Sequence, residues 1–230
     1  MPASEDSVPG KVSSLRDQSG SVYVVGYIHE PSDPNGDGLV FTHGAGGNSD
    51  SALLRTLGQA FADAGYVVLR CDLPFRQARR SGPPRPGDAA RDRDGLERAL
   101  QLMRDRVRAR LFLGGQSYGG RQATMLMADK PELADGLLLT SYPLHPPGKP
   151  GQLRTQHFPR LRTPALFVEG SRDPFASFDE MESALNLISA RTSMVRIDGG
   201  GHDLVGRKPA AAEEIARAIV SAFQELFGKK

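Results

Sequence analysis

A serine occupies the middle of the segment Gly115-Gln116-Ser117-Tyr118-Gly119, which fits the pattern G-x-S-x-G. An apolar run precedes the segment and apolar residues at helical spacing follow it, so the motif lies between a predicted strand and a predicted helix. A sharp turn in that context exposes the serine hydroxyl, and the helix N-terminus favours developing negative charge. The pattern predicts that Ser117 is a nucleophile; the alternative is a glycine-rich turn without chemistry. A dinucleotide-binding loop is excluded because the glycines do not fit G-x-G-x-x-G.

A serine hydroxyl is a weak nucleophile unless a base, itself held by a third group, takes its proton. Where the nucleophile follows a strand in this way, the chain order is Ser, then Asp or Glu, then His. Of the five histidines, His202 is the one that follows a late predicted strand, after three consecutive glycines. Asp173 comes just after the predicted strand at residues 165–168. We therefore predict Ser117, Asp173 and His202 as nucleophile, orienting acid and base, with Glu169 as the alternative acid.

Acyl transfer also requires hydrogen-bond donors aimed at the developing oxyanion. One donor is expected to be the backbone N–H of the residue after the nucleophile, here Tyr118, and the other to come from the loop after an early strand. The early strand at residues 39–42 runs into the glycine-rich sequence HGAGG. We assign the second donor to Ala45, and we expect Gly46 to approach the substrate and His43 to brace the loop. A nucleotide-binding P-loop is disfavoured, because no Lys-Ser or Lys-Thr pair follows these glycines.

The elements that must position these residues alternate between strand and helix along nearly the whole chain. Short apolar or β-branched runs predict strands at residues 21–29, 39–42, 66–69, 111–113, 137–140, 165–168 and 194–197. Apolar residues at helical spacing predict helices at residues 51–64, 89–109, 118–128, 178–188 and 210–227. This alternation is typical of the α/β class, with a mostly parallel central sheet and helices on both faces. We expect one domain over residues 1–230, with residues 1–10 frayed.

Composition excludes several functional classes for this chain of 230 residues. Its net charge of +2 gives no support for nucleic-acid binding. The single cysteine, Cys71, excludes an internal disulfide and multi-cysteine zinc sites. No apolar run approaches the roughly 20 residues that span a bilayer, and acidic residues stand where a signal peptide has positive charge. We expect a cytoplasmic protein without membrane or nucleic-acid partners, and no metal or organic cofactor, because the triad itself supplies base and electrophile.

These elements together resemble the α/β-hydrolase superfamily, over nearly the whole chain. More narrowly, the chain resembles the small hydrolases with little or no lid typified by testis-expressed protein 30 and its bacterial relatives. The segments that carry the resemblance are THGAG, GGQSYGG, SYPLHP, GSRD and GH, at residues 42–46, 114–120, 141–146, 170–173 and 201–202. The resemblance implies the triad Ser117, Asp173 and His202. Dienelactone hydrolases share the fold but have cysteine as nucleophile, and Cys71 lies elsewhere.

The substrate pocket is less well specified by the sequence. Many enzymes of this fold insert a lid where this chain has only a short proline-rich stretch at residues 142–164. We therefore expect a minimal lid and an open site suited to small or short-chain esters, with Tyr142, Leu144 and His145 as candidate pocket walls. The arginine-rich loop at residues 76–93 either receives an anionic substrate group or is a solvated loop paired with nearby aspartates.

The leading hypothesis is a serine hydrolase that cleaves a small carboxylic ester through an acyl-enzyme. One alternative is a non-catalytic interaction scaffold on a hydrolase fold, as in the hydrolase-like subunit of a chromatin acetyltransferase complex. Another is an acyltransferase, thioesterase or peptidase that uses the same triad. The acyl group, the alcohol and the oligomeric state remain open.

Overall fold

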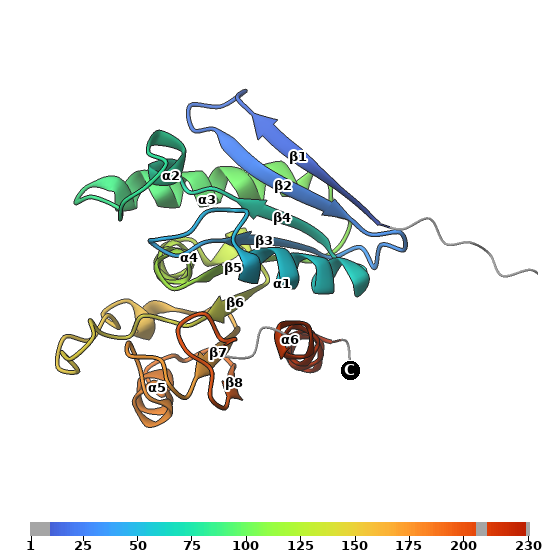
Figure 1. The fold of residues 1–230 in the computed structure, drawn as a ribbon. Coiled ribbons are helices and arrows are strands. Elements are labelled where there is room, and N and C mark those ends of the chain that lie inside the picture. Colours follow the sequence, from blue (N-terminus) through green and yellow to red (C-terminus); the bar gives the residue numbers. More distant parts are fainter. Residues whose placement is uncertain (1–9, 206–210, 229–230) are drawn as a thin grey trace, which may run out of the picture.

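A computed structural model of the chain describes residues 10–205 and 211–228. Its strands form one eight-stranded sheet in the order β1-β2-β4-β3-β5-β6-β7-β8 (Figure 1). Strands β1 and β2 are antiparallel to their neighbours, whereas β3 to β8 run parallel. The strands are β1 (Lys11–Asp17), β2 (Val24–Glu30), β3 (Gly38–Thr42), β4 (Val67–Cys71), β5 (Leu111–Gln116), β6 (Gly136–Thr140), β7 (Ala165–Gly170) and β8 (Thr192–Ile197).

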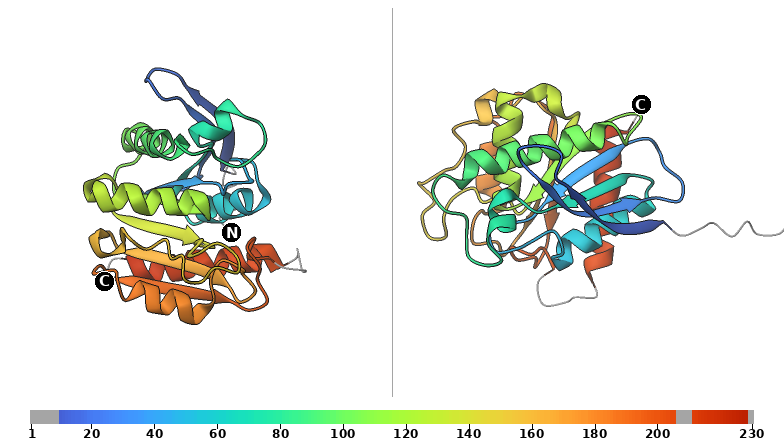
Figure 2. Two further views of the ribbon diagram at one scale, coloured as in Figure 1. Left: turned by 90° about the vertical axis from the view of Figure 1, so that its left-hand side faces the viewer. Right: turned by 90° about the horizontal axis from the view of Figure 1, so that it is seen from above.

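Helices cover both faces of this sheet (Figures 1 and 2). Helices α1 and α6 contribute to the apolar core on one face, and α3, α4 and α5 contribute to the core on the other. The helices are α1 (Ala52–Asp63), α2 (Pro74–Ala78), α3 (Asp88–Arg104), α4 (Tyr118–Asp129), α5 (Phe178–Leu185) and α6 (Ala212–Phe227), with short 3-10 turns η1 (Pro131–Leu133) and η2 (Phe158–Arg160). No helix among the described residues is both long and apolar enough to cross a membrane.

The central strands form because their side chains are apolar on both faces. In β3, Val40 packs into the core under α3 and α4, while its neighbours Leu39 and Phe41 pack under α1 and α6. All three side chains are at most 1% exposed. Such continuous apolar runs are typical of parallel strands that are covered on both sides. The predicted α/β class, with its mostly parallel sheet and helices on both faces, is confirmed.

Strand β1 and helix α2 are among the elements that were not predicted from the sequence. Strand β1 is an exposed edge strand that pairs with β2, and the β1–β2 hairpin projects at one end of the molecule (Figure 2). Helix α2 is a five-residue helix with a proline in its first turn. It overlaps the start of the arginine-rich segment at residues 76–93, which is expected from the sequence to be a loop. Of the residues expected to be frayed, 1–9 lie outside the described residues.

The parallel strands all end at the same edge of the sheet, and this places the loops that follow β3, β4, β5, β6 and β7 next to one another. The connection from β6 to β7 contains only η2 as regular structure, so the expected minimal lid is confirmed.

Candidate active site

Ser117 lies in the sharp turn between β5 and α4. Its backbone has φ 50° and ψ −116°, a left-handed conformation that a non-glycine residue rarely adopts. The turn is closed by close backbone contacts: a Cβ atom on Gly115 would lie 2.7 Å from the carbonyl carbon of Gly119. A Cβ atom on Gly119 would lie 2.5 Å from the carbonyl oxygen of His43. The glycines of the motif are therefore required for this turn.

The three predicted triad residues come together in one hydrogen-bonded chain. His202 Nε2 lies 2.8 Å from Ser117 Oγ, and His202 Nδ1 lies 2.7 Å from Asp173 Oδ2. Because the carboxylate can only accept, Nδ1 carries the proton, and the lone pair of Nε2 faces the serine hydroxyl. The other oxygen of Asp173 accepts a 2.9 Å hydrogen bond from the backbone N–H of Phe175, which fixes the carboxylate.

The alternative acid, Glu169, has a different position. It lies within β7, is completely buried, and its Oε1 accepts a 2.6 Å hydrogen bond from the N–H of Tyr142. Burial raises the pKa of Glu169 well above its ordinary value. Asp173, and not Glu169, contacts His202.

The glycine-rich loop after β3 directs its carbonyl groups away from the serine. The carbonyl of Gly44 accepts from His43 Nδ1 at 2.8 Å, and the carbonyl of Ala45 accepts from Arg76 Nη2 at 2.9 Å. A trans peptide points its N–H opposite to the preceding carbonyl, so the N–H groups of Ala45 and Gly46 point away from these partners. Among the described residues, no acceptor binds the N–H of Ala45 or that of Tyr118. Ala45, Gly46 and Tyr118 all line the cavity beside Ser117.

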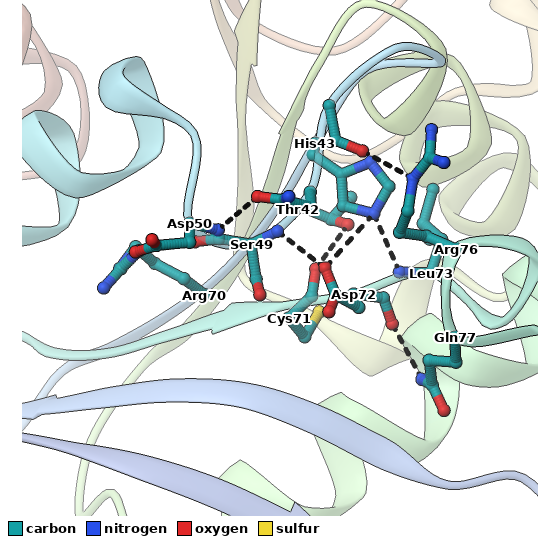
Figure 3. Close-up of polar contacts among 12 residues, drawn as sticks. Thr42, His43, Ser49, Asp50, Arg70, Cys71, Asp72, Leu73, Arg76 and Gln77 are labelled. Carbon is teal, nitrogen blue, oxygen red and sulfur yellow. Dashed lines mark hydrogen bonds and ion pairs between the residues drawn. The ribbon is translucent and has the colours of Figure 1, made fainter. Parts of the chain in front are cut away.

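His43 fixes the start of this loop from beneath, as the sequence predicts. It is fully buried, and its Nε2 accepts a 3.1 Å hydrogen bond from the N–H of Leu73 (Figure 3). Its Nδ1 donates to the carbonyl of Gly44. Burial lowers the pKa of His43, which keeps the ring neutral in this donor and acceptor arrangement. Asp72 Oδ1 accepts a 2.6 Å hydrogen bond from the N–H of Ser49 and so fixes the other end of the loop.

Arg76 is a further brace of the same loop, and sequence reasoning missed this role. Its Nε donates to the carbonyl of Gly47 at 2.7 Å, in addition to the bond from Nη2 to Ala45. Its remaining hydrogen bonds go to the carbonyls of Arg79 and Gly82, at 3.2 and 3.1 Å. Both Asp72 and Arg76 follow β4, the strand beside β3, and that neighbourhood is the signal that could have identified them.

A cavity of about 490 Å³ opens above the serine. It is lined by the loop at residues 44–47, by residues 116–118, and by Arg121, Pro143, Arg154, Phe175 and His202. Gly46 is therefore placed at the cavity, as predicted.

The prediction that Tyr142, Leu144 and His145 form pocket walls is wrong, because none of them lines this cavity. Tyr142 and Leu144 are fully buried, and His145 is 5% exposed. Tyr142 packs against Phe158 and its hydroxyl donates to the carbonyl of Arg154, so it supports the wall from behind. The proline-rich loop folds these apolar side chains into the core and presents Pro143 and Arg154 to the cavity instead.

Much of the arginine-rich loop at residues 76–93 has internal partners. Arg79 forms an ion pair of 2.5 Å with Asp88, Arg93 donates to Gln122, and Arg76 is the loop brace described above. None of the loop's arginines lines the cavity beside Ser117. Within the described residues, no group of three or more His, Cys, Asp or Glu side chains is arranged to hold a metal ion.

A family model described as an alpha/beta hydrolase domain matches residues 36–226. The chain belongs to the α/β-hydrolase family. Among solved structures, a dienelactone hydrolase from Anabaena variabilis is similar with a TM-score of 0.74 and 21% identity, over 95% of this chain and 99% of that one. An alpha-beta serine hydrolase homologue from Coxiella burnetii matches with a TM-score of 0.74 and 19% identity, over 91% and 96%.

A serine hydrolase without a lid from Xanthomonas campestris is also similar, with a TM-score of 0.68 and 14% identity over 98% of this α/β-hydrolase and 100% of the other chain. At these identities the likeness establishes the fold alone. Family membership supports hydrolysis as the class of reaction. The hydrogen bonds that join Ser117, His202 and Asp173 are observed in the structure of this α/β-hydrolase itself and are not inferred from its relatives.

Proposed function

We propose that this α/β-hydrolase is a serine hydrolase that cleaves a small or short-chain carboxylic ester through an acyl-enzyme. The observation that carries the proposal is the chain from Asp173 through His202 to Ser117, with hydrogen bonds of 2.7 and 2.8 Å. The strained backbone of Ser117 supports it, because such strain is concentrated at functional sites.

In the proposed reaction, Ser117 Oγ attacks the ester carbonyl carbon while His202 Nε2 takes the hydroxyl proton. Asp173 holds the His202 ring in the required tautomer and stabilises the imidazolium that forms. The bond from the carbonyl carbon to the alcohol oxygen then breaks, and His202 returns the proton to that oxygen. Water, activated by the same histidine, attacks the acyl-enzyme, releases the carboxylic acid and regenerates the serine.

The N–H groups of Ala45 and Tyr118 are proposed to hold the negatively charged oxygen of the tetrahedral intermediate. Three features support this role: both residues line the cavity, both N–H groups lack an acceptor among the described residues, and the carbonyl of Gly44, which lies opposite the Ala45 N–H in the same peptide, is bound by His43. Loss of one such donor typically costs about 3–4 kcal/mol of transition-state stabilisation.

The substrate size is argued from the cavity. Its volume of about 490 Å³ and the short connection between β6 and β7 suit a small molecule better than a long acyl chain. Pro143 and Phe175 provide its apolar wall, and Gly46 leaves room beside the oxyanion position.

The test is labelling with a fluorophosphonate, read by intact mass, on the wild type and on Ser117→Ala. We expect one adduct on the wild type and none on the variant, together with loss of hydrolysis of a short-chain aryl ester. Ser141→Ala is a matched control, because Ser141 also has positive φ but lies outside the cavity lining. No adduct on a folded wild type would favour the interaction scaffold instead.

A further inference from the structure

Two arginines line the cavity beside Ser117. Arg121 lies in the first turn of α4, where its N–H donates to the carbonyl of Ser117 at 2.9 Å, and Arg154 lies in the loop between β6 and β7. No aspartate or glutamate is among the described residues that line this cavity. Neither arginine forms an ion pair within the part of the chain that the structure describes. Two uncompensated positive charges therefore lie next to the nucleophile.

Arg154 is held in place by its backbone. Its N–H donates to the carbonyl of Leu144 at 2.8 Å, and its carbonyl accepts from the Tyr142 hydroxyl at 2.9 Å. The guanidinium makes one side-chain hydrogen bond, from Nη1 to the carbonyl of Pro143 at 3.2 Å. A guanidinium has five N–H donors, so most of this group's donors remain for a ligand. The buried residues Tyr142 and Leu144 thus hold the backbone of Arg154, whose side chain lines the cavity.

Arg121 and Arg154 also act on each other. Burial, and the positive charge of Arg121, lower the pKa of Arg154. The Nε atom of Arg121 is shielded from solvent and has no hydrogen-bond partner among the described residues. Two like charges brought together without a counter-ion are unfavourable, and a bound anion would offset the repulsion and supply further hydrogen-bond acceptors.

Other arginines that are not exposed have partners for their guanidinium groups within the described residues. Arg79, Arg98 and Arg110 each form an ion pair of 2.5 Å with an aspartate. Arg76 and Arg93 also lack an acidic partner, but Arg76 donates to four backbone carbonyls and Arg93 donates to Gln122.

We propose that the substrate carries an anionic carboxylate or phosphate group, which Arg121 and Arg154 bind while the ester carbonyl lies at Ser117. The planar fork of a guanidinium fits the paired oxygens of either group. This inference rests on the proposed function and narrows its substrate class.

The experiment compares anionic esters with neutral partners of similar structure. With the charge on the alcohol side, 4-acetoxybenzoate and 4-acetoxyphenyl phosphate are compared with neutral 4-acetoxybenzamide. With the charge on the acyl side, phenyl hydrogen adipate is compared with its methyl ester. We expect at least one anionic ester to exceed its neutral partner in kcat/KM by about 10-fold or more, since hydrogen bonds to charged groups are among the stronger ones. Comparing the carboxylate esters with the phosphate ester shows which of the two anionic groups the enzyme prefers.

Variants then assign the preference to the two arginines. Arg154→Gln and Arg121→Gln should each lower the ratio of anionic to neutral kcat/KM by about 10-fold, and Arg154→Lys should retain more of it than Arg154→Gln. The control is Arg160→Gln, which removes the same charge from an exposed arginine paired with Asp129 and should leave the ratio unchanged. If Arg121→Gln does not fold, Arg154→Gln alone decides the assignment.

The outcomes separate this inference from the proposed function. A fluorophosphonate adduct on Ser117 together with equal or faster hydrolysis of the neutral esters would overturn the anionic substrate and leave the hydrolase intact. A preference for anions that persists in both glutamine variants would also overturn it. No adduct at all would overturn the proposed function, and this inference with it.

Discussion

The Tyr118 hydroxyl donates a 2.8 Å hydrogen bond to Asp92 Oδ2, so the residue after the nucleophile is tied to helix α3 by its side chain. The other oxygen of Asp92 accepts from the N–H of Phe75 at 2.9 Å, and Asp92 is fully buried. Burial and the Asp92 carboxyl raise the pKa of Tyr118, which therefore remains a donor. The nucleophile turn is thus anchored from outside the cavity.

Tyr118→Phe should lower the free energy of unfolding by about 1–3 kcal/mol, because a buried carboxyl loses one of its donors. Urea unfolding measures this change. A double-mutant cycle with Asp92→Asn should show a coupling energy above about 0.5 kcal/mol, and strictly additive effects would contradict the link. Tyr23→Phe is the control: Tyr23 is 46% exposed, and its loss of hydroxyl should change stability by less than about 0.5 kcal/mol.

Asp173→Asn should lower kcat for ester hydrolysis by up to about 10⁴-fold, because an amide at this position favours the wrong tautomer of His202. Stopped or continuous hydrolysis assays measure the effect. Asp198→Asn, an exposed position between β8 and His202, is the matched control and should retain turnover. A loss of only a few fold in Asp173→Asn would mean that another group orients the histidine.

Glu169 allows a prediction of pH dependence. Its pKa in the folded protein is raised well above the ordinary value of 4.5 by burial, so the folded state keeps a proton that the unfolded chain releases. The corresponding stability is fully present below pH 4.5 and is lost as pH rises towards the folded pKa.

Glu169→Gln removes this dependence, while an amide oxygen can still accept from the N–H of Tyr142. Relative to the wild type, the variant should therefore become more stable as pH rises, by up to about 1.4 kcal/mol per pH unit. Unfolding measurements from about pH 5 to about pH 8 test the slope. A constant difference between the two proteins over this range would refute the raised pKa.

The sequence was sufficient to predict the residues whose positions follow from local pattern. Ser117 sits at the end of an apolar strand, and Asp173 and His202 follow later strands in the expected order, so parallel topology alone brings them to one edge. The β-strand Lys11–Asp17 could not be predicted in the same way. It is an exposed edge strand without an apolar run, and its pairing with β2 is a tertiary contact.

The walls of the cavity could not be predicted either, for a different physical reason. Tyr142 and Arg154 lie in one irregular loop, and nothing in their spacing says which side chain faces the core. The apolar ring of Tyr142 is buried against Phe158, and the charged end of Arg154 is left at the cavity. The bracing role of Arg76 likewise depends on backbone carbonyls of a distant loop, which have no sequence signature.

Arg76→Met tests whether that brace contributes to catalysis. The substitution removes hydrogen bonds to the carbonyls of Ala45 and Gly47, so the loop that carries the Ala45 N–H should lose its fixed shape. Because oxyanion donors act in the transition state, kcat should fall by about 10- to 100-fold with a smaller change in KM. Arg76→Lys should rescue little, since an ammonium group cannot reproduce the planar fork.

The control for Arg76 is Arg80→Met, which removes the same charge from a nearby exposed side chain that no described hydrogen bond or ion pair uses. Thermal unfolding of both variants separates a loss of fold from a loss of turnover. If Arg76→Met and Arg80→Met lowered kcat equally, the effect would come from net charge and not from the loop. A fall in kcat confined to Arg76→Met, in a protein that still unfolds cooperatively, would show that a buried cation behind the loop positions the oxyanion donor.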